Sequence, residues 1–374
     1  MANVSLKNLS GIQPGKDGSD STALSNVNLE IQDHEFVVLT GPAHCGISSI
    51  IRMIAGLDAV SEGDVFIGDR RVTDLLPKDR DIALVSQAYA PYPRMSVYEN
   101  LAFGLKRRKF PPAEIKKRVL AAAEIFGLQD MLETKAPSLS SAQRQRVAFA
   151  RAIALQPKVF LFDEPHANLE PKMRGQMRNL LAKLHQRLQA TMIYATYDPI
   201  EAMALAGRLV VVNDGAIQQD GTASSLYDEP ANSFVAEFLS PPMNLVQGTL
   251  KQDRDSLIFS EKDDGTIELR WPISEFPTAR DLAGKPVLLG IRPEDIRVAQ
   301  PSTGRGSSGS FRAIVDLVEV LGAEANIYLQ TGAHALVCRT ALSVDQGEAG
   351  HRLQFALNAS KVRLFDPISR LRLN

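Results

Sequence analysis

The chain has 374 residues, a formal net charge of −1, 44% hydrophobic residues and 23% charged residues. This length predicts two or three domains, and the near-neutral charge gives no electrostatic reason to expect a nucleic-acid partner. Two cysteines argue against a disulfide framework, and neither a signal-peptide pattern nor a membrane-spanning apolar run is evident, so any membrane role is expected to be peripheral, through a protein partner.

Up to about residue 235, short apolar runs alternate with segments of helical periodicity. This alternation predicts an α/β layer architecture with a largely parallel sheet. The runs expected to form buried strands are residues 36–39, 159–162, 191–196 and 209–212. Each is apolar throughout, as in strands that are covered on both faces. The stripe of Met173, Met177, Leu180, Leu181, Leu184 and Leu188 predicts a helix that faces the core.

The first apolar run leads into "GPAHCGISS", residues 41–49, which has the outline of a phosphate-binding loop, G-x-x-x-x-G-K-S/T. Gly41, Gly46 and Ser48 keep their places, but Ile47 stands where the lysine should be. In such a loop, backbone N–H groups surround the phosphates, the lysine reaches the β and γ oxygens, and the hydroxyl holds magnesium. Taken alone, this match leaves an ordinary strand–turn–helix as the alternative.

Residues 88–140 interrupt the strand alternation with helical periodicity around a Pro-rich turn. We expect an inserted helical subdomain that extends to about residue 150. Its basic run, residues 106–109, is interpreted as a solvated face.

The next apolar run, in "KVFLFDEPHANLE", ends in two adjacent acids. A carboxylate at Asp163 can reach magnesium through water, and Glu164 can polarise an attacking water. The alternative is a charged exit from the strand. The two acids lie at about the sequence distance from the loop that is seen in nucleotide hydrolases.

After Pro241 and Pro242, which mark a linker, the composition shifts to short β-type runs separated by Gly, Asp and Ser. This pattern predicts a second domain built as a small Greek-key barrel. We therefore expect one domain at residues 1–238 and another at residues 239–374.

Between the loop and the acidic strand lies "LSSAQRQRVAFARAIALQP", and with it the chain resembles the ATP-binding subunit of an ABC transporter, whose signature is LSGGQ. The loop, Gln87, the signature, the acidic strand and "YATYDPIEAMALAGRLVVV" follow the family order. Residues 241–374, with "GIRPEDI", are similar to the C-terminal domain of bacterial carbohydrate-importer ATPases of the maltose type. The resemblance implies a P-loop NTPase-like domain with an inserted helical subdomain, plus a C-terminal all-β, OB-like (TOBE-type) domain for regulation or dimerisation.

The resemblance also implies a site for ATP and Mg²⁺. The implied nucleotide contacts are Gly41, Pro42, His44, Cys45, Gly46, Ile47, Ser48, Ser49, Ser140 and Gln143. The implied magnesium ligands are Ser48, Gln87 and Asp163, and the implied catalytic residues are Glu164, Gln87 and Tyr197.

Several positions depart from the family pattern. They are Gln13 for an adenine-stacking aromatic, His44 for glycine, Ile47 for lysine, Ser141 and Ala142 for the signature glycines, Glu170 for aspartate and Tyr197 for the switch histidine. A hydrogen bond from a charged group is worth about 1.5 to 3 kcal/mol, so the loss of the lysine alone predicts nucleotide binding weakened roughly ten- to a hundredfold.

We therefore expect the energy-coupling subunit of a carbohydrate importer with impaired ATP hydrolysis, acting as a non-equivalent half of an ATPase pair. The alternatives are a scaffold or regulator that does not bind ATP productively, and a working ATPase with a residual rate. The partners implied are membrane-spanning permease subunits, a second ATPase subunit (a second copy or an intact paralogue) and an extracytoplasmic sugar-binding protein, with no nucleic acid. The location implied is peripheral, on the cytoplasmic face of the membrane.

Overall fold

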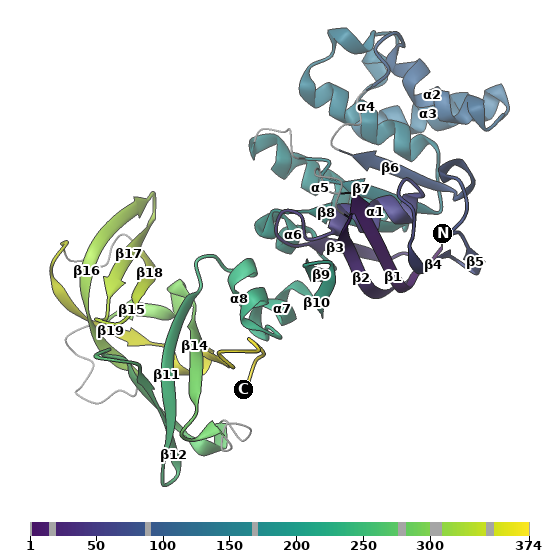
Figure 1. Cartoon of the computed structure of the whole chain (residues 1–374). Helices are drawn as coiled ribbons and strands as arrows, with labels where there is room; N and C mark the ends of the chain where they lie inside the picture. Colours follow the sequence, from purple (N-terminus) through teal and green to yellow (C-terminus); the bar gives the residue numbers. More distant parts are fainter. Residues whose placement is uncertain are drawn as a thin grey trace. The chain divides into compact units, whose positions relative to one another are not determined.

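The computed structural model describes residues 2–14, 20–86, 91–166, 171–275, 282–299, 309–341 and 348–373. The chain forms two compact units, Met1–Ser224 and Ser225–Asn374 (Figure 1). None of the helices in these ranges combines the length and apolar character needed to cross a membrane.

The first unit is built on a six-stranded sheet in the order β10-β9-β3-β8-β7-β6. Its strands are β3 (Phe36–Thr40), β6 (Ile82–Ser86), β7 (Val159–Asp163), β8 (Thr191–Thr196), β9 (Arg208–Asn213) and β10 (Ala216–Gly221). All neighbours pair in parallel except β9 and β10. The largely parallel sheet predicted from the apolar runs is confirmed, and β3 and β8 are buried along their whole length.

Three helices follow the carboxyl ends of these strands: α1 (Ile47–Ala55) after β3, α5 (Pro171–Leu188) after β7 and α6 (Pro199–Leu205) after β8. In α5, Met177, Leu181 and Leu184 are buried, which confirms the core-facing stripe. The carboxyl ends of parallel strands lie at one edge of a sheet, so the segments after β3, β7 and β8 meet there.

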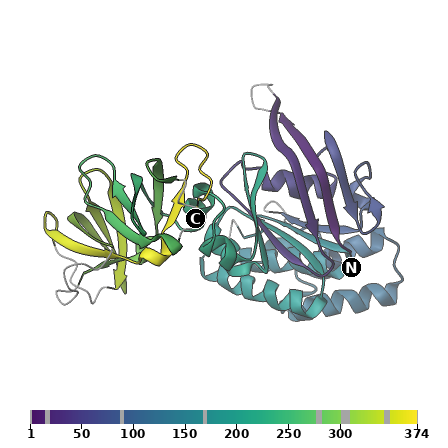
Figure 2. The same cartoon turned by 90° about the horizontal axis from the view of Figure 1, so that it is seen from below.

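A second, antiparallel sheet in the first unit has the order β2-β1-β4-β5. It contains β1 (Val4–Pro14), β2 (Asp20–Ile31), β4 (Glu62–Ile67) and β5 (Arg70–Arg71). The long β1–β2 ribbon projects from the unit in Figure 2. Apolar residues of β1, β2, β4 and α1 share one core with those of β3, β7, β8 and β9. Helix α1 is therefore enclosed between two sheets.

The inserted helices are α2 (Val97–Arg107), α3 (Pro112–Phe126) and α4 (Ser141–Ala154). Ser96 begins α2 with a capping box, in which its hydroxyl accepts from the backbone of Glu99 and the Glu99 carboxylate accepts from the backbone of Ser96. Phe126 and Phe149 stack with ring centroids 6.2 Å apart and join α3 to α4. The predicted helical insertion is thus present.

The second unit is an all-β barrel, nearly closed, preceded by α7 (Ala223–Asp228) and α8 (Ser233–Leu239). One sheet has the order β13-β12-β11-β14-β20, from Asn244–Asp253 (β11), Ser256–Glu261 (β12), Glu268–Pro272 (β13), Pro286–Ile291 (β14) and Arg363–Phe365 (β20). The other has the order β15-β19-β16-β17-β18, from Ile296–Val298 (β15), Ser310–Leu321 (β16), Glu324–Gln330 (β17), Ala335–Ala341 (β18) and Arg352–Leu357 (β19).

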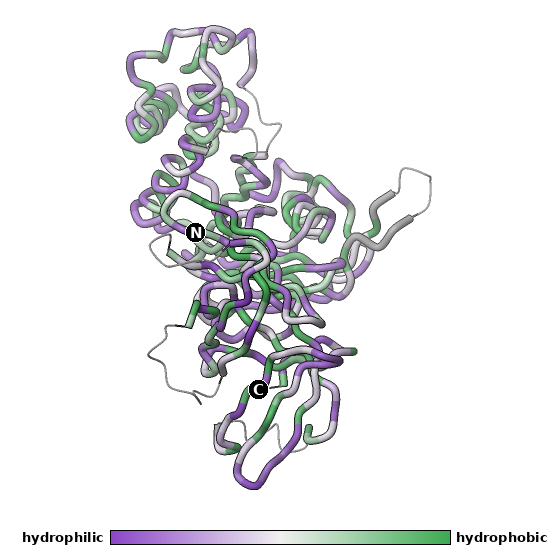
Figure 3. The backbone as a smooth tube through the Cα atoms, turned by 90° about the vertical axis from the view of Figure 1, so that its left-hand side faces the viewer, coloured by the Kyte–Doolittle hydropathy of each residue, from purple (hydrophilic) through white to green (hydrophobic). Residues whose placement is uncertain are grey.

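Burial alternates along β12 and β13, as in sheets with one face on a core and one in water, and Figure 3 shows both hydrophobic and hydrophilic residues along the strands of this unit. The barrel core includes Trp271, Phe259, Phe355 and Cys338. Helix α8 belongs with this unit, because the N–H of Ser233 donates to the carbonyl of Arg370 at 2.9 Å. The division after Ser224 therefore lies ahead of the boundary expected after residue 238.

Candidate functional site

The loop between β3 and α1 takes a backbone path that requires glycine at two positions. A Cβ on Gly41 would lie 2.0 Å from the carbonyl oxygen of Val212. Gly46 caps α1 with φ 105, in the left-handed region. His44 also has a positive φ of 67 and is exposed to solvent. The loop thus keeps the tight bend of a phosphate-binding loop, with His44 at a position that favours glycine.

The side chain of Ile47 is fully buried. It belongs to the core cluster that also contains Ile50, Ile51 and Val212. Its contribution to a nucleotide site is limited to its backbone N–H, since the side chain offers neither charge nor donor. Residues 41–49 contain no lysine or arginine.

Two other loop side chains are also turned inward. Cys45 is 2% exposed and Ser49 is 8% exposed. Burial raises the pKa of the Cys45 thiol, although backbone hydrogen bonds oppose the shift. The buried thiol of Cys45 is withdrawn from a nucleotide, to which this residue can offer its backbone N–H.

Three of the predicted site residues meet at the carboxyl edge of the sheet. Ser48 Oγ donates to Asp163 Oδ1 at 2.7 Å, and Tyr197 OH lies 3.1 Å from Ser48 Oγ. Since the single proton of Ser48 is directed to Asp163, Tyr197 is the donor in the second bond. Burial raises the pKa of Asp163, partly offset by the bond from Ser48.

Magnesium prefers hard oxygen ligands, and the hydroxyl of Ser48 and the carboxylate of Asp163 are such a pair. When bound, the ion would stabilise negative charge on phosphate oxygens. Within the ranges that the structure describes, no group of three or more His, Cys, Asp and Glu could hold a metal ion by itself. Phosphate oxygens or further ligands would have to complete the coordination.

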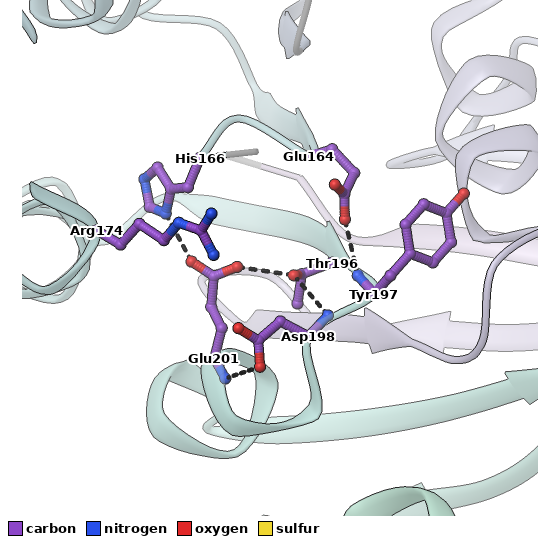
Figure 4. A pocket seen from close by; sticks show the side chains of 7 residues that line it. All are labelled: Glu164, His166, Arg174, Thr196, Tyr197, Asp198 and Glu201. Carbon is purple, nitrogen blue, oxygen red and sulfur yellow. Dashed lines mark hydrogen bonds and ion pairs between the residues drawn. The ribbon is translucent and has the colours of Figure 1, made fainter. Parts of the chain in front are cut away.

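Glu164 is held beside this trio by its own backbone and side chain. It has φ 50, and its N–H donates to the carbonyl of Ala195 at 3.0 Å. Its Oε1 accepts from the backbone N–H of Tyr197 at 2.8 Å (Figure 4). Burial raises the pKa of Glu164, and the bond from Tyr197 opposes this. A carboxylate with a raised pKa suits general-base work near neutral pH.

A polar cavity of about 240 Å³ lies next to Glu164. Its lining residues, drawn in Figure 4, are Glu164, His166, Arg174, Thr196, Tyr197, Asp198 and Glu201. Glu201 pairs with His166 Nδ1 at 2.7 Å and accepts from Thr196 Oγ1 at 2.7 Å. Burial raises the pKa of Glu201, but the bonds from His166 and Thr196 outweigh it and the net shift is downward.

This network ties the segment after β7 to the segment after β8, and sequence reasoning missed it. His166 and Glu201 lie in segments that the motifs cover, but neither has a motif role. A buried histidine paired with an acid 35 positions away has no spacing signal. The only sequence signal for Glu201 is an acidic residue at a position of a short helix that would be expected to face the core.

The signature residues Ser140 and Gln143 are engaged with each other at the start of α4. Ser140 Oγ accepts from the N–H of Gln143 at 3.2 Å, and Gln143 Oε1 accepts from the N–H of Ser140 at 2.8 Å. In the described part of the chain, these are the hydrogen bonds of their side chains. Both side chains therefore cap the start of α4.

Three of the sequence predictions cannot be placed. Gln87, expected at the magnesium ion and in catalysis, and Glu170 lie outside the described residues. The side chain of Gln13 is likewise not described.

A second depression, a groove of about 620 Å³, lies between α1, β6, α2 and α4. Its lining includes the apolar Leu57, Leu84, Tyr92 and Phe103 and the basic Lys78, Arg107 and Arg108. Tyr92 and Phe103 are in ring contact at 4.7 Å. Leu57 is 48% exposed and Tyr92 is 38% exposed, so this groove presents apolar surface within a basic rim.

Comparison with known families gives three matches along the chain. Residues 24–167 match the ABC transporter family, residues 240–296 match the MalK OB fold domain, and residues 289–365 match the TOBE domain. The last two matches together cover most of the barrel unit.

Similar proteins cover nearly the whole chain. The oligosaccharides import ATP-binding protein MsmX of Bacillus subtilis is 45% identical over 94% of this chain and 95% of its own length. The sn-glycerol-3-phosphate import ATP-binding protein UgpC of Chromobacterium violaceum is 42% identical over 100% of this chain and 96% of its own. A solved dimer of the ATP-binding cassette MJ0796, bound to ADP and Pi, has a TM-score of 0.53 and 31% identity over 59% of this chain and 98% of its own.

Proposed function

Because this chain belongs to the ATP-binding proteins of ABC transporters, we propose that it is the energy-coupling subunit of a carbohydrate importer in which ATP hydrolysis is impaired. The substrate class is carried over from the relatives whose names specify oligosaccharide and glycerol-phosphate import. The observation that supports the impairment is the buried side chain of Ile47, which leaves the loop without its phosphate-binding cation.

The other site residues support a nucleotide site with weakened phosphate contacts. Ser48 and Asp163 are bonded to each other at 2.7 Å and offer magnesium an oxygen pair, and Glu164 lies next to them. Backbone N–H groups and a metal supply much of the stabilisation of a phosphoryl transition state. Nucleotide binding is therefore proposed to persist, while turnover falls with the loss of the lysine.

Family members act in pairs, and symmetry then decides the consequence for turnover. In a pair of identical chains, each site would combine Ile47 of one copy with Ser141 and Ala142 of the other. With an intact paralogue, one site would have a complete phosphate-binding loop facing this chain's altered signature. We propose the second arrangement, in which this chain is the weak half of an unequal ATPase pair.

The proposed docking surface for the permease is the groove between α1, β6, α2 and α4. A cytoplasmic segment that is apolar on one side and acidic at its margins would match Leu57, Tyr92 and Phe103 within the rim of Arg107 and Arg108. In this proposal the chain lies on the cytoplasmic face of the membrane, and an extracytoplasmic sugar-binding protein delivers the substrate to the assembled importer from the other side.

Steady-state ATP hydrolysis by the purified chain tests the impairment. We expect a rate close to that of the Glu164→Gln variant, which removes the proposed general base and serves as the background control. A rate far above that background, abolished by Glu164→Gln, would show a working ATPase. Binding of MgADP and MgATP by calorimetry tests the nucleotide site independently of turnover.

A second candidate, a non-catalytic scaffold or regulator, is favoured by the bond between Tyr197 and Ser48, which engages the hydroxyl proposed to hold magnesium. Calorimetry separates the two functions. A chain that binds neither nucleotide, alone or with a partner ATPase, is a scaffold.

A further inference from the structure

Tyr197 crosses the gap between Glu164 and Ser48. Its backbone N–H is held by Glu164 Oε1 at 2.8 Å, and its hydroxyl lies 3.1 Å from Ser48 Oγ. The ring packs against the core cluster that contains Ile47. In Figure 4 the backbone N–H of Tyr197 is bonded to Glu164, and the ring points away from the other residues that line the cavity. The side chain of Tyr197 therefore spans the interval between its own backbone, which is bonded to Glu164, and the loop hydroxyl of Ser48.

That interval is where the terminal phosphate of a triphosphate has to lie. Ser48 and Asp163 would hold a magnesium ion, which would offset negative charge on the phosphate oxygens, and the water that attacks the γ phosphate would approach from the side of Glu164. If Glu164 polarises that water, the γ phosphate lies between Glu164 and the magnesium ligands. A nucleoside diphosphate ends before this position.

The hydroxyl groups of Tyr197 and Ser48 form a continuous chain of hydrogen bonds that ends at Asp163. Tyr197 donates to Ser48, which in turn donates to Asp163, so every hydroxyl proton in the chain of bonds has an acceptor. A terminal phosphate could enter only if the ring left, which would break this bond and uncover apolar surface.

The charges around the gap also disfavour a third phosphate. Asp163 and Glu164 both border it, and residues 41–49 carry no lysine or arginine. Arg52, the basic residue of α1, is already bonded to Asp58 through Nε at 2.9 and 3.0 Å. A third phosphate would add negative charge beside two carboxylates without a loop cation to offset it, although Arg174 also lines the cavity beside Glu164.

We infer that this site selects a nucleoside diphosphate over a nucleoside triphosphate, with Tyr197 as the specificity-determining residue. The inference rests on the proposed function, because it requires that the chain binds nucleotide. In an unequal ATPase pair, this half would hold a diphosphate while the partner's loop carries the triphosphate.

Calorimetric titration of the full chain with MgADP and with MgATP tests the inference. We expect MgADP to bind at least about tenfold more tightly, the lower end of what one charged hydrogen bond supplies. Tyr197→Ala, which empties the gap, is expected to shift the ratio of the two affinities toward MgATP by about tenfold or more, with MgADP affinity nearly unchanged. Tyr197→Phe keeps the ring and is expected to keep the preference for MgADP.

The outcomes separate this inference from the proposed function. MgATP binding as tightly as MgADP to the unaltered chain, or an unchanged ratio in Tyr197→Ala, would overturn the role of Tyr197 and leave the nucleotide site standing. Absence of binding by both nucleotides would overturn the nucleotide site and this inference together. Retained MgADP affinity in Tyr197→Ala also shows that the variant is folded.

Discussion

Restoring the missing cation by Ile47→Lys should strengthen nucleotide binding. Position 47 directly precedes Ser48, whose hydroxyl is bonded to Asp163 at 2.7 Å. The backbone at position 47 therefore lies where a phosphate-binding loop has its lysine. A lysine there would reach the β-phosphate oxygens, which both ADP and ATP possess. MgADP is the appropriate probe, because its binding does not require Tyr197 to move.

Two opposing effects set the expected magnitude. A hydrogen bond from a charged donor contributes about 1.5 to 3 kcal/mol, which is a gain of roughly ten- to a hundredfold in affinity. Ile47 is fully buried, so replacing it gives up about 1.5 to 3 kcal/mol of apolar burial, less whatever the methylene stem of lysine recovers, and an ammonium that extends to water avoids the larger cost of a buried charge. Domains have stabilities of about 5 to 15 kcal/mol, and the variant should fold.

The assay is calorimetric titration with MgADP, run beside denaturant unfolding of each variant. Ile47→Met is the matched control, because it keeps the volume and adds no charge, and its affinity should equal that of the unaltered chain. If Ile47→Lys folds and binds MgADP no better than Ile47→Met, the loss of the lysine is not what weakens this site.

Two further predictions concern stability. Gly41→Ala would bring a Cβ to 2.0 Å from the Val212 carbonyl and should destabilise the first unit by about 1 to 3 kcal/mol in urea unfolding, whereas Gly175→Ala, in α5 with its nearest neighbour at 3.8 Å, should be neutral or slightly stabilising. A destabilisation of equal size in both would refute the steric argument. The pKa of Glu201 is held below its usual value of 4.5. Its contribution to the free energy of unfolding is therefore fully present above pH 4.5 and is lost as the pH falls through the lowered folded-state pKa. The stability difference between the unaltered chain and Glu201→Gln should therefore shrink below about pH 4.5, and a constant difference would exclude an ionised Glu201 stabilised by its bonds to His166 and Thr196.

The sequence predicted the main sheet because each of its central strands is apolar throughout. Phe36–Thr40 and Thr191–Thr196 are covered on both faces and carry no competing polar pattern. The antiparallel sheet of β1, β2, β4 and β5 was not predicted. Val4–Pro14 and Asp20–Ile31 mix polar and apolar residues, and their pairing has register shifts that disturb a two-residue alternation.

The positions of site residues could be predicted where a motif fixes the backbone. The directions in which their side chains point could not, because these depend on packing. Ser48, Asp163 and Tyr197 were expected near one another, and the structure joins them directly. The inward turn of Ile47 and the reach of Tyr197 to Ser48 depend on the core between the two sheets, which no local pattern describes. The pair of His166 and Glu201 likewise exists only because the ends of β7 and β8 are neighbours.

The placement of the two native thiols makes the protein convenient for distance spectroscopy. Cys45 is buried in the first unit and Cys338 in the second, and burial raises the pKa of Cys338 to about 12. Neither is a ready target for maleimide reagents, which attack thiolates at accessible sites. A cysteine introduced on the surface of either unit could therefore be labelled selectively with a fluorophore or spin label. Motions during nucleotide exchange could then be followed without first replacing Cys45 and Cys338.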